Sequence, residues 1–481
     1  MGTERRAEAL ERLPSKDLVR READKRRALR VVLLLALTGS GVGHAAVPNP
    51  CDPLTYGAVA DGVTDNTVAI QKAIDTCAAL GGGTVPFDQG VFLTGPFTLK
   101  DDILLRIAAG ATILGTTDQS RYLPAYIGTR YRAGEALIST DNATDVGIIG
   151  GGTIDGQGDV DSPGGHSWYY LASNPPFNNF PYASYPFAPS SNGLPRPWLV
   201  EFWMTDHIVV QGVHLARSPM WTLVPRYGTD VTIVGISDSA PSTSRNTDAI
   251  DVVSSDHVTI SSVNFASGDD DVALKSGLPP LYQDPNALPM PQAATQHVTV
   301  ANAVFTSGHG MSIGSEAING VHDIDISNVA LSNTSNGFRI KTGRDRGSVI
   351  KDITAQNLTM TNVTQPIVIN SYYPASSPPA CGSDTTPQPI TSTTPYVSNI
   401  TLRNVAAAGA TNLSFIAGLA ESYVQNVTLD NVTVRQASAS VKPMDLRWMN
   451  GTFSNVTVSP TSTGHNFACL EGVTVTGESL P

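Results

Sequence analysis

The chain has 481 residues, of which 41% are hydrophobic and only 15% charged, with 43 Gly, 33 Pro and 4 Cys. This composition excludes an intrinsically disordered chain and a long coiled coil, and its many turn-forming residues favour a folded, largely β protein. Length alone would suggest about three domains, but a repetitive fold grows by adding units. The number of domains therefore depends on whether the sequence repeats.

The N-terminal segment carries a possible targeting signal. A basic stretch ending at Arg30 precedes a short apolar run over residues 31–37, and small residues follow at Gly43 and Ala45. The run is too short to cross a bilayer and is typical of a secretory signal peptide, although a buried helix is the alternative. We expect residues 1–45 to be the signal and residues 46–481 the folded domain, secreted to the extracellular space through the periplasm.

Without residues 1–45 the chain has 20 Lys and Arg against 36 Asp and Glu, a net charge of about −16. Such a surface repels nucleic acids and anionic membranes, so neither is an expected partner. Any polyanionic ligand would need a local basic site. No sequence feature indicates an oligomer interface, so a monomer is expected.

Four cysteines in a chain that meets an oxidising compartment indicate disulfides. Their spacing fits no zinc or redox motif. Of the three possible pairings we expect Cys51 with Cys77 and Cys381 with Cys469, because each pair then lies at one end of the chain.

A seven-residue phrase recurs from residue 207 onward, in which a polar residue precedes alternating aliphatic positions. It begins at His207, Asp230, His257, His297, Asp323, Asp352, Asn399 and Asn426. The alternation predicts short strands with one buried face. Most intervals are near 26 residues, and the two longer ones contain Pro-rich inserts at residues 278–291 and 373–395. A unit this short cannot bury its own apolar face but stacked units can, so the repeat predicts a solenoid.

The sixth position of the phrase is often Asn, namely at Asn302, Asn328, Asn357, Asn404 and Asn431. Asn tolerates a left-handed backbone and can bond to its counterpart one coil away, which predicts an asparagine ladder. The histidines at the first position, His207, His257 and His297, are interpreted as turn residues.

An amphipathic segment at residues 65–80, with Val68, Ile70, Ala73, Ile74 and Cys77 at helical spacing, predicts a helix that caps the open end of the solenoid. Strands are expected at residues 90–99 and 103–115. Residues 161–195 are rich in Gly, Pro and aromatics and predict a long loop.

Acidic and basic residues suited to acid–base catalysis and to ion pairing occur at the ends of consecutive repeats. Asn246-Thr247-Asp248, Gly268-Asp269-Asp270-Asp271, Gly308-His309-Gly310 and Arg339-Ile340-Lys341 follow one another at roughly one coil each. Stacking predicts that they are vertical neighbours. Crowded carboxylates raise the pKa of at least one member, which supplies the acid and the base needed to cleave a glycosidic bond. The two adjacent cations suit a substrate carboxylate.

These four motifs, together with GGGTIDGQG from Gly150, resemble those of the polygalacturonases of glycoside hydrolase family 28. The segments PSTSRNTDAID and SGDDDVALKSG are similar to the corresponding segments of bacterial members. The likeness extends from about Leu54 to the C-terminus. It implies an all-β, single-stranded right-handed parallel β-helix. It also implies inverting hydrolysis of α-1,4-linked galacturonan in pectate, without a metal or other cofactor.

The resemblance also implies individual roles. Asp269 is expected to be the general acid, Asp248 and Asp270 to activate water, and His309 to support the acid. Arg339 and Lys341 are expected to bind the galacturonate carboxylate, and Tyr373 to line the subsite, although Tyr372 beside it leaves the register open. The chain departs from the family pattern at Ala249, where Gly is frequent, and at Asp271, which adds a carboxyl that could raise the pKa of its neighbours.

Three alternatives stay open. The sequences of the motifs favour cleavage inside the polymer. The inserts at residues 161–195 and 278–291 could instead close one end of the cleft, which would give exo action. A calcium-dependent pectate lyase is also a β-helix, and a non-catalytic β-helix could only bind polysaccharide.

Overall fold

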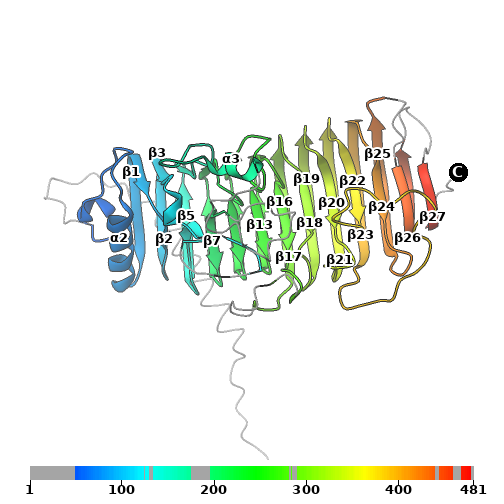
Figure 1. Ribbon diagram of the computed structural model, residues 1–481, viewed down its shortest axis with the longest axis horizontal. Coiled ribbons are helices and arrows are strands. Elements are labelled where there is room, and N and C mark those ends of the chain that lie inside the picture. The colour runs from blue at the N-terminus through cyan, green and yellow to red at the C-terminus, as the bar shows by residue number, and fades with distance from the viewer. Residues whose placement is uncertain are drawn as a thin grey trace, which may run out of the picture. The chain divides into compact units, whose positions relative to one another are not determined.

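The structure of the chain is a computed structural model that describes residues 49–123, 125–128, 130, 134–174, 196–280, 283, 290–438, 444–458 and 467–477. The expected signal at residues 1–45 lies outside the described residues. From Asn49 onward the chain forms one compact unit. In Figure 1 its strands follow one another in chain order, each beside the strand one coil away.

The strands form three parallel stacks. The first stack consists of β2 (Phe97–Thr98), β4 (Ala136–Ser139), β7 (Trp198–Trp203), β10 (Leu223–Arg226), β13 (Ile250–Val253), β16 (Val272–Lys275), β18 (Met311–Gly314), β20 (Asn336–Lys341), β22 (Gln365–Asn370) and β24 (Ser414–Ala417). The second consists of β1 (Gly83–Thr94), β3 (Ile103–Gly115), β5 (Thr144–Gly150), β8 (Asp206–Gln211), β11 (Thr229–Val234), β14 (Asp256–Ser261), β17 (Thr295–Phe305), β19 (Val321–Ser332), β21 (Val349–Thr361), β23 (Tyr396–Ala410) and β25 (Val424–Gln436). The third consists of β6 (Thr153–Asp155), β9 (His214–Ala216), β12 (Ser237–Ser239) and β15 (Asn264–Ala266), and the long strands from β17 onward continue it. At the C-terminal end β26 (Met444–Val458) pairs with β24, β25 and β27 (Phe467–Thr476).

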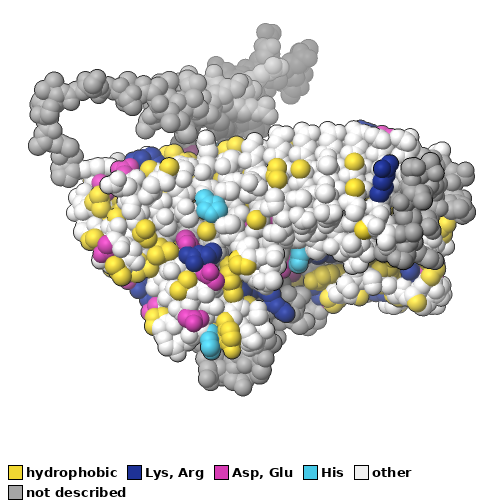
Figure 2. Space-filling view, turned by 90° about the horizontal axis from the view of Figure 1, so that it is seen from above, with side chains coloured by type: hydrophobic (Ala, Val, Ile, Leu, Met, Phe, Trp, Pro, Cys, Tyr) yellow, Lys and Arg dark blue, Asp and Glu magenta, His cyan; other side chains and the backbone are white. Residues whose placement is uncertain are grey.

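This arrangement is the right-handed parallel β-helix that the repeat and the resemblance predicted. The alternation works as expected: in β14 the side chains of Val258 and Ile260 are buried, whereas His257 and Thr259 face outward. Inward aliphatic side chains from successive coils make one continuous core. Burial of these apolar columns is what holds neighbouring coils together. Charged side chains are sparse on the face shown in Figure 2, in keeping with the low charged content.

The predicted asparagine ladder is present at one corner. The Asn328, Asn357, Asn404 and Asn431 side-chain amides each donate to the oxygen of the ladder residue one coil earlier, over 2.9–3.2 Å, and Asn455 extends the series. Each of these residues has a φ between 54° and 58°. Asn is favoured there because it tolerates the left-handed backbone that turns the chain and can also bond along the stack.

The N-terminal cap is the helix α2 (Thr67–Ala79), at the blue end of Figure 1. Its buried residues are Ile70, Ala73, Ile74 and Cys77, which lie at the i, i+3, i+4, i+7 spacing of a single face. The inclusion of Val68 on that face was wrong, since its side chain is 83% exposed. Val68 precedes Ile70 by two residues and therefore points to the opposite side of the helix.

Both expected disulfides, Cys51–Cys77 and Cys381–Cys469, are formed. The first joins the segment before α2 to the helix itself. The expected strands at residues 90–99 and 103–115 correspond to β1 with β2 and to β3. Short helices lie at η1 (Pro53–Tyr56), η2 (Gln119–Arg121) and α3 (Trp168–Ser173), and α3 belongs to the expected loop at residues 161–195, of which residues 175–195 are outside the described chain. Among the described residues, the helices are too short or too polar to cross a bilayer.

Candidate functional site

The four motifs of the sequence lie on consecutive coils of the first stack, three just before a strand and the fourth within one. Asp248 precedes β13, Asp269 and Asp270 precede β16, His309 precedes β18, and Arg339 and Lys341 belong to β20. These strands pair in the order β13, β16, β18, β20, β22. The structure therefore brings together residues that the sequence separates by up to 93 positions, from Asp248 to Lys341.

Two glycines present His309 at this edge. Gly308 and Gly310 have φ values of 99° and 71°, in the left-handed region. A Cβ on Gly310 would lie 2.2 Å from the Asn336 carbonyl oxygen, and one on Gly308 would lie 2.3 Å from Ser267 Oγ. The motif needs glycine on both sides because the backbone passes too close to the neighbouring coils for any side chain.

Asp269 and His309 form a direct pair. His309 Nδ1 lies 2.7 Å from Asp269 Oδ1, and the His309 backbone N–H donates to the Asp269 carbonyl over 2.7 Å. Burial alone would raise the pKa of Asp269, but the charge and hydrogen bond of His309 more than offset it and lower the pKa to about 2. With side-chain exposures of 19% and 36%, Asp269 and His309 are the most accessible members of the cluster.

Asp270 is fully buried and held by two cations. Arg339 pairs with its Oδ1, Lys341 Nζ lies 2.8 Å from its Oδ2, and Ser312 donates to Oδ1 over 2.8 Å. Burial would raise the pKa of Asp270, but Arg339 and Lys341 overcome this effect and hold it far below the usual value. Asp270 is therefore a permanent carboxylate, and the two cations are shared with it in the free protein.

The raised pKa expected from crowded carboxylates belongs to Asp248. Burial and the charges of Asp251 and Asp269 raise the pKa of Asp248 well above its usual value, and Lys275 opposes them from 3.6 Å. Asp251 lies three residues later, in β13. Burial raises its pKa to about 7, although the Lys275 ammonium group at 2.8 Å acts to lower it. The carboxyls of the site with raised pKa values are therefore Asp248 and Asp251, whereas the pKa of Asp269 is lowered.

Asp271 is a buried carboxyl that binds the neighbouring coil. Its carboxyl is buried, accepts hydrogen bonds from Ser267 Oγ and the Gly310 N–H, and has a pKa raised well above the usual value by burial. The side chain therefore serves as a hydrogen-bonding link to the GHG turn.

The structure distinguishes the two adjacent tyrosines that the sequence left open. The ring of Tyr373 lies 6.0 Å from Lys341 Nζ and 5.0 Å from the Arg346 guanidinium. Tyr372 instead lies 5.6 Å from the Arg344 guanidinium and packs against Val368 and its neighbours. Of the two rings, Tyr373 is the one that borders the cationic part of the cluster.

Sequence reasoning missed a second layer beneath the motifs. Lys275 is buried beside Asp248 and Asp251, lies 3.6 Å from Glu316, and stacks over Trp221 at 3.7 Å. Arg196 is also buried: it donates to Asn246 Oδ1 over 2.9 Å, and burial lowers its pKa to about 10. Lys275 lies within SGDDDVALKSG, and Glu316 follows the Gly308-His309-Gly310 motif in the segment GHGMSIGSE, so their proximity to the motifs was the available signal.

Asp269, Asp270 and His309 have ligand atoms close enough to hold a metal ion. However, Arg339 and Lys341 already bind Asp270 on its two oxygens. An added cation at this point would meet two positive charges at short range, so the donor set does not favour a metal.

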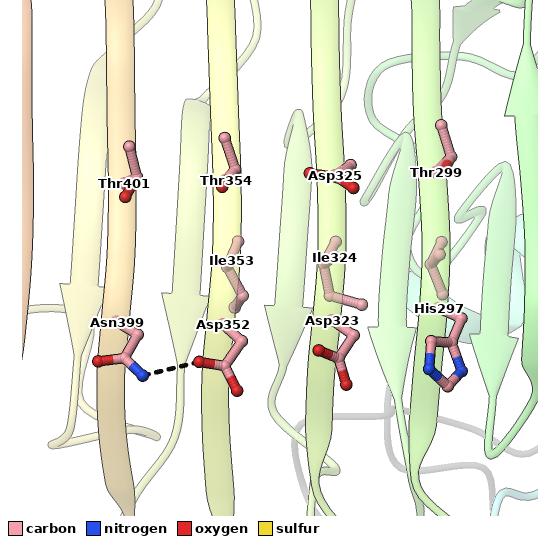
Figure 3. A pocket seen from close by; sticks show the side chains of 11 residues that line it. His297, Thr299, Asp323, Ile324, Asp325, Asp352, Ile353, Thr354, Asn399 and Thr401 are labelled. Atoms are coloured by element: carbon pink, nitrogen blue, oxygen red, sulfur yellow. Dashed lines mark hydrogen bonds between the residues drawn. The ribbon is translucent and has the colours of Figure 1, made fainter.

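A shallow groove of about 540 Å³ lies elsewhere, on the second stack (Figure 3). Its lining consists of outward side chains of β17, β19, β21 and β23 in two rows, including His297, Asp323, Asp352 and Asn399 at the corner and Thr299, Asp325, Thr354 and Thr401 beside them. The groove contains none of the predicted site residues and is distinct from the cluster described above.

Comparison with known proteins places this geometry in a family. The sequence profile described as Glycosyl hydrolases family 28 matches residues 84–452. An endo-polygalacturonase of Pectobacterium carotovorum subsp. carotovorum is 31% identical over 341 residues, covering 69% of this chain and 77% of the relative.

Solved structures agree with this placement. The polygalacturonase of Erwinia carotovora ssp. carotovora has a TM-score of 0.62 at 26% identity and covers 91% of this chain and all of its own. An exopolygalacturonase of Thermotoga maritima has a TM-score of 0.70 at 24% identity, over 90% of this chain and 96% of its own, which supports the fold. The family profile matches most of the chain, and the four motifs lie together on a parallel β-helix. The protein therefore belongs to family 28 of the glycosyl hydrolases.

Proposed function

We propose that the protein is a secreted polygalacturonase that hydrolyses α-1,4 bonds of polygalacturonate with inversion, and that it cleaves inside the polymer. The observation that carries the proposal is the Asp269–His309 pair beside Asp248 and Asp270, bordered by Arg339 and Lys341. The similarity to endo-polygalacturonases of Pectobacterium supports this substrate and endo action. The two disulfides suit an extracellular protein.

Asp269 is proposed as the proton donor because it is the most exposed carboxyl of the three in the site. His309 Nδ1 lies 2.7 Å from Asp269 Oδ1 and lowers the pKa of that carboxyl, so Asp269 must gain its proton before it can act as the acid. Asp269 first takes up a proton, for which His309 Nδ1 at 2.7 Å is the adjacent exchange partner, and it passes this proton to the leaving oxygen as the bond from C1 to that oxygen breaks. The pair thus acts as one acid.

Asp248 and Asp270 are proposed to bind and activate the water that attacks C1 from the opposite face. Asp270 is always ionised because two cations hold it, and Asp248 depends on Lys275 for its charge. Inversion follows when water, and not a carboxylate, attacks C1. The galacturonate carboxylate is proposed to bind the remaining donors of Arg339 and Lys341, with Tyr373 bordering the same sugar.

The test is digestion of polygalacturonate with product analysis. We expect new reducing ends without ultraviolet-absorbing unsaturated products, and unchanged activity after treatment with chelator. Unsaturated products or inactivation by chelator would establish a lyase, and no new reducing ends would establish a binding protein. Rapid loss of viscosity at low bond cleavage is the expected sign of endo action, whereas release of mono- or digalacturonate from the start would show exo action.

A further inference from the structure

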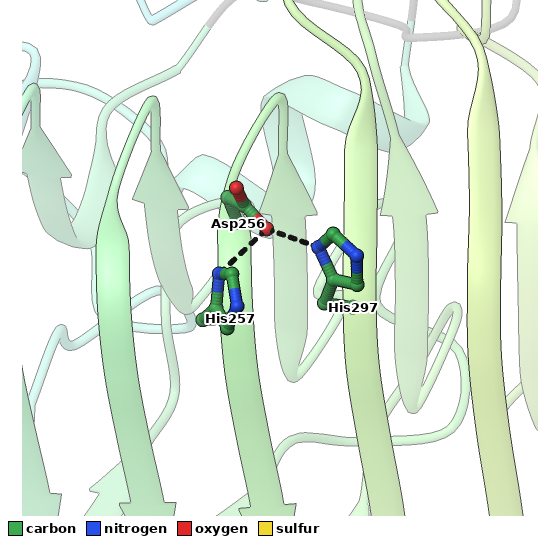
Figure 4. Close-up of side chains that lie close together, drawn as sticks. All are labelled: Asp256, His257 and His297. Carbon is green, nitrogen blue, oxygen red and sulfur yellow. Dashed lines mark hydrogen bonds and ion pairs between the residues drawn. The ribbon is translucent and has the colours of Figure 1, made fainter. Parts of the chain in front are cut away.

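A cluster of two histidines and an aspartate, residue types that can ligate a metal, lies on the surface of the second stack. Asp256 and His257 are the first two residues of β14, and His297 lies at the equivalent place in β17. Register pairing sets Asp256 beside Gln296 and Val258 beside Val298, so His257 and His297 are side by side on adjacent coils. Their rings stack with centroids 4.6 Å apart (Figure 4).

Both imidazoles point to the same carboxylate oxygen. Asp256 Oδ1 lies 2.9 Å from His257 Nδ1 and 2.7 Å from His297 Nδ1, and the potential ligand atoms of all three residues lie within 4.8 Å of one another. Gln296 Nε2 donates to the other oxygen of Asp256 over 3.1 Å, which orients the carboxylate. Two nitrogens and one oxygen thus converge on one point, with a supporting hydrogen bond behind them.

The backbone prearranges this convergence. His257 and His297 have φ values of 55° and 51°, and the left-handed turn at this corner directs both side chains outward. The 62%, 48% and 32% exposures of His257, His297 and Asp256 leave room for an ion and for further water ligands. The same corner position one coil away on either side is occupied by Asp230 and Asp323, which make the local potential favourable to a cation.

We propose that Asp256, His257 and His297 form a surface site for a late first-row divalent metal such as Zn²⁺, Ni²⁺ or Cu²⁺. Bonds of about 2.0–2.1 Å around a tetrahedral ion put neighbouring ligand atoms roughly 3.3 Å apart. The His257 and His297 nitrogens lie 2.9 and 2.7 Å from Asp256 Oδ1, so the imidazoles must move slightly away from the carboxylate to admit the ion between them. Imidazole with carboxylate selects these ions over Ca²⁺, which prefers oxygen ligands alone. The bound ion would join two adjacent coils on a face separate from the hydrolytic residues.

The test is calorimetric titration of the folded, chelator-treated protein with ZnCl₂ at pH 7.5. We expect one high-affinity Zn²⁺ per chain, at least tenfold weaker binding in His257→Ala and in His297→Ala, and a melting temperature that rises with Zn²⁺ in the wild type only. His207→Ala is the matched control, because His207 occupies the same repeat position but faces Asp145 and Asp230 and no second imidazole. It should bind Zn²⁺ within twofold of the wild type.

Two further variants locate the ion. His309→Ala should retain the site, because the hydrolytic cluster is not involved, and Asp256→Asn should weaken binding like the histidine variants. Binding to wild type that is no tighter than to the His257→Ala/His297→Ala double variant would overturn the proposal. Loss of binding in His309→Ala alone would also overturn it by assigning the ion to the hydrolytic cluster. Electron paramagnetic resonance of bound Cu²⁺ should report two nitrogen ligands, and a single nitrogen would contradict the assignment.

Discussion

Replacement of Lys275 by methionine tests whether a buried cation keeps the water-activating carboxylate ionised. Lys275 Nζ lies 3.6 Å from Asp248 Oδ2 and both side chains are only 3% exposed. At an effective dielectric constant of about 20, a charge pair at this distance is worth roughly 5 kcal/mol, which corresponds to more than three pKa units. Asp251 and Glu316 share the same ammonium group, so part of the effect falls on them.

The sign follows from the charge that is removed. Lys275 favours the ionised form of Asp248, so Lys275→Met raises the pKa of Asp248 further and leaves less carboxylate at mildly acid pH. We expect the acid limb of the kcat/KM profile on polygalacturonate, followed by reducing-end release, to move up by at least one pH unit. Activity at the acid end should fall at least tenfold.

Controls separate this effect from a loss of folding. Lys351→Met removes an exposed lysine that pairs with Asp352 and should leave the profile unchanged. Because removing one partner of a buried ion pair can cost about 3–5 kcal/mol, circular dichroism and thermal melting must accompany the kinetics. Lys275→Arg keeps the charge and should shift the limb less than methionine does. A folded Lys275→Met enzyme with the wild-type pH profile would refute the reasoning.

Three further predictions concern the acid, the cations and the core. Asp269→Asn should lower kcat on polygalacturonate at least 10²-fold with KM nearly unchanged, since it removes proton transfer and little else; near wild-type turnover would contradict its role. Arg339→Leu should raise KM and also lower kcat, because it takes one partner from Asp270 and one donor from the substrate carboxylate; an unchanged KM would argue against substrate contact. Asp238 faces inward between Leu215 and Phe265, and burial raises its pKa well above the usual value. As the pH rises, Asp238 therefore ionises in the unfolded chain before it ionises in the folded chain. The free energy of unfolding falls by about 1.4 kcal/mol per pH unit until the pH reaches the pKa of Asp238 in the folded chain. Asp238→Asn should raise the melting temperature at pH 8 more than at pH 4, and an equal change at both would contradict the sign.

The sequence by itself determined the repeat, the capping helix, the ladder and the order of the four motifs. These features depend on short-range physics: alternation of aliphatic residues, tolerance of Asn for a left-handed turn, and helical spacing of residues 70–77. Because each coil has nearly the same length, equal positions along the repeat become neighbours in space. For that reason Asp269 and His309 could be paired from their places in the repeat alone.

The tertiary structure decided which charges share the interior of the site. Asp251 and Lys275 reach it from β13 and β16, and Glu316 from the turn after β18. The burial of Asp248 and the charge of Asp251 raise the pKa of Asp248 against Lys275, whereas His309 lowers that of Asp269. The repeat made His257 and His297 neighbours, but their shared contact with Asp256 emerged only in three dimensions. Burial and interatomic distance govern these electrostatic effects, and both depend on how side chains from different coils pack together rather than on any local pattern of residues.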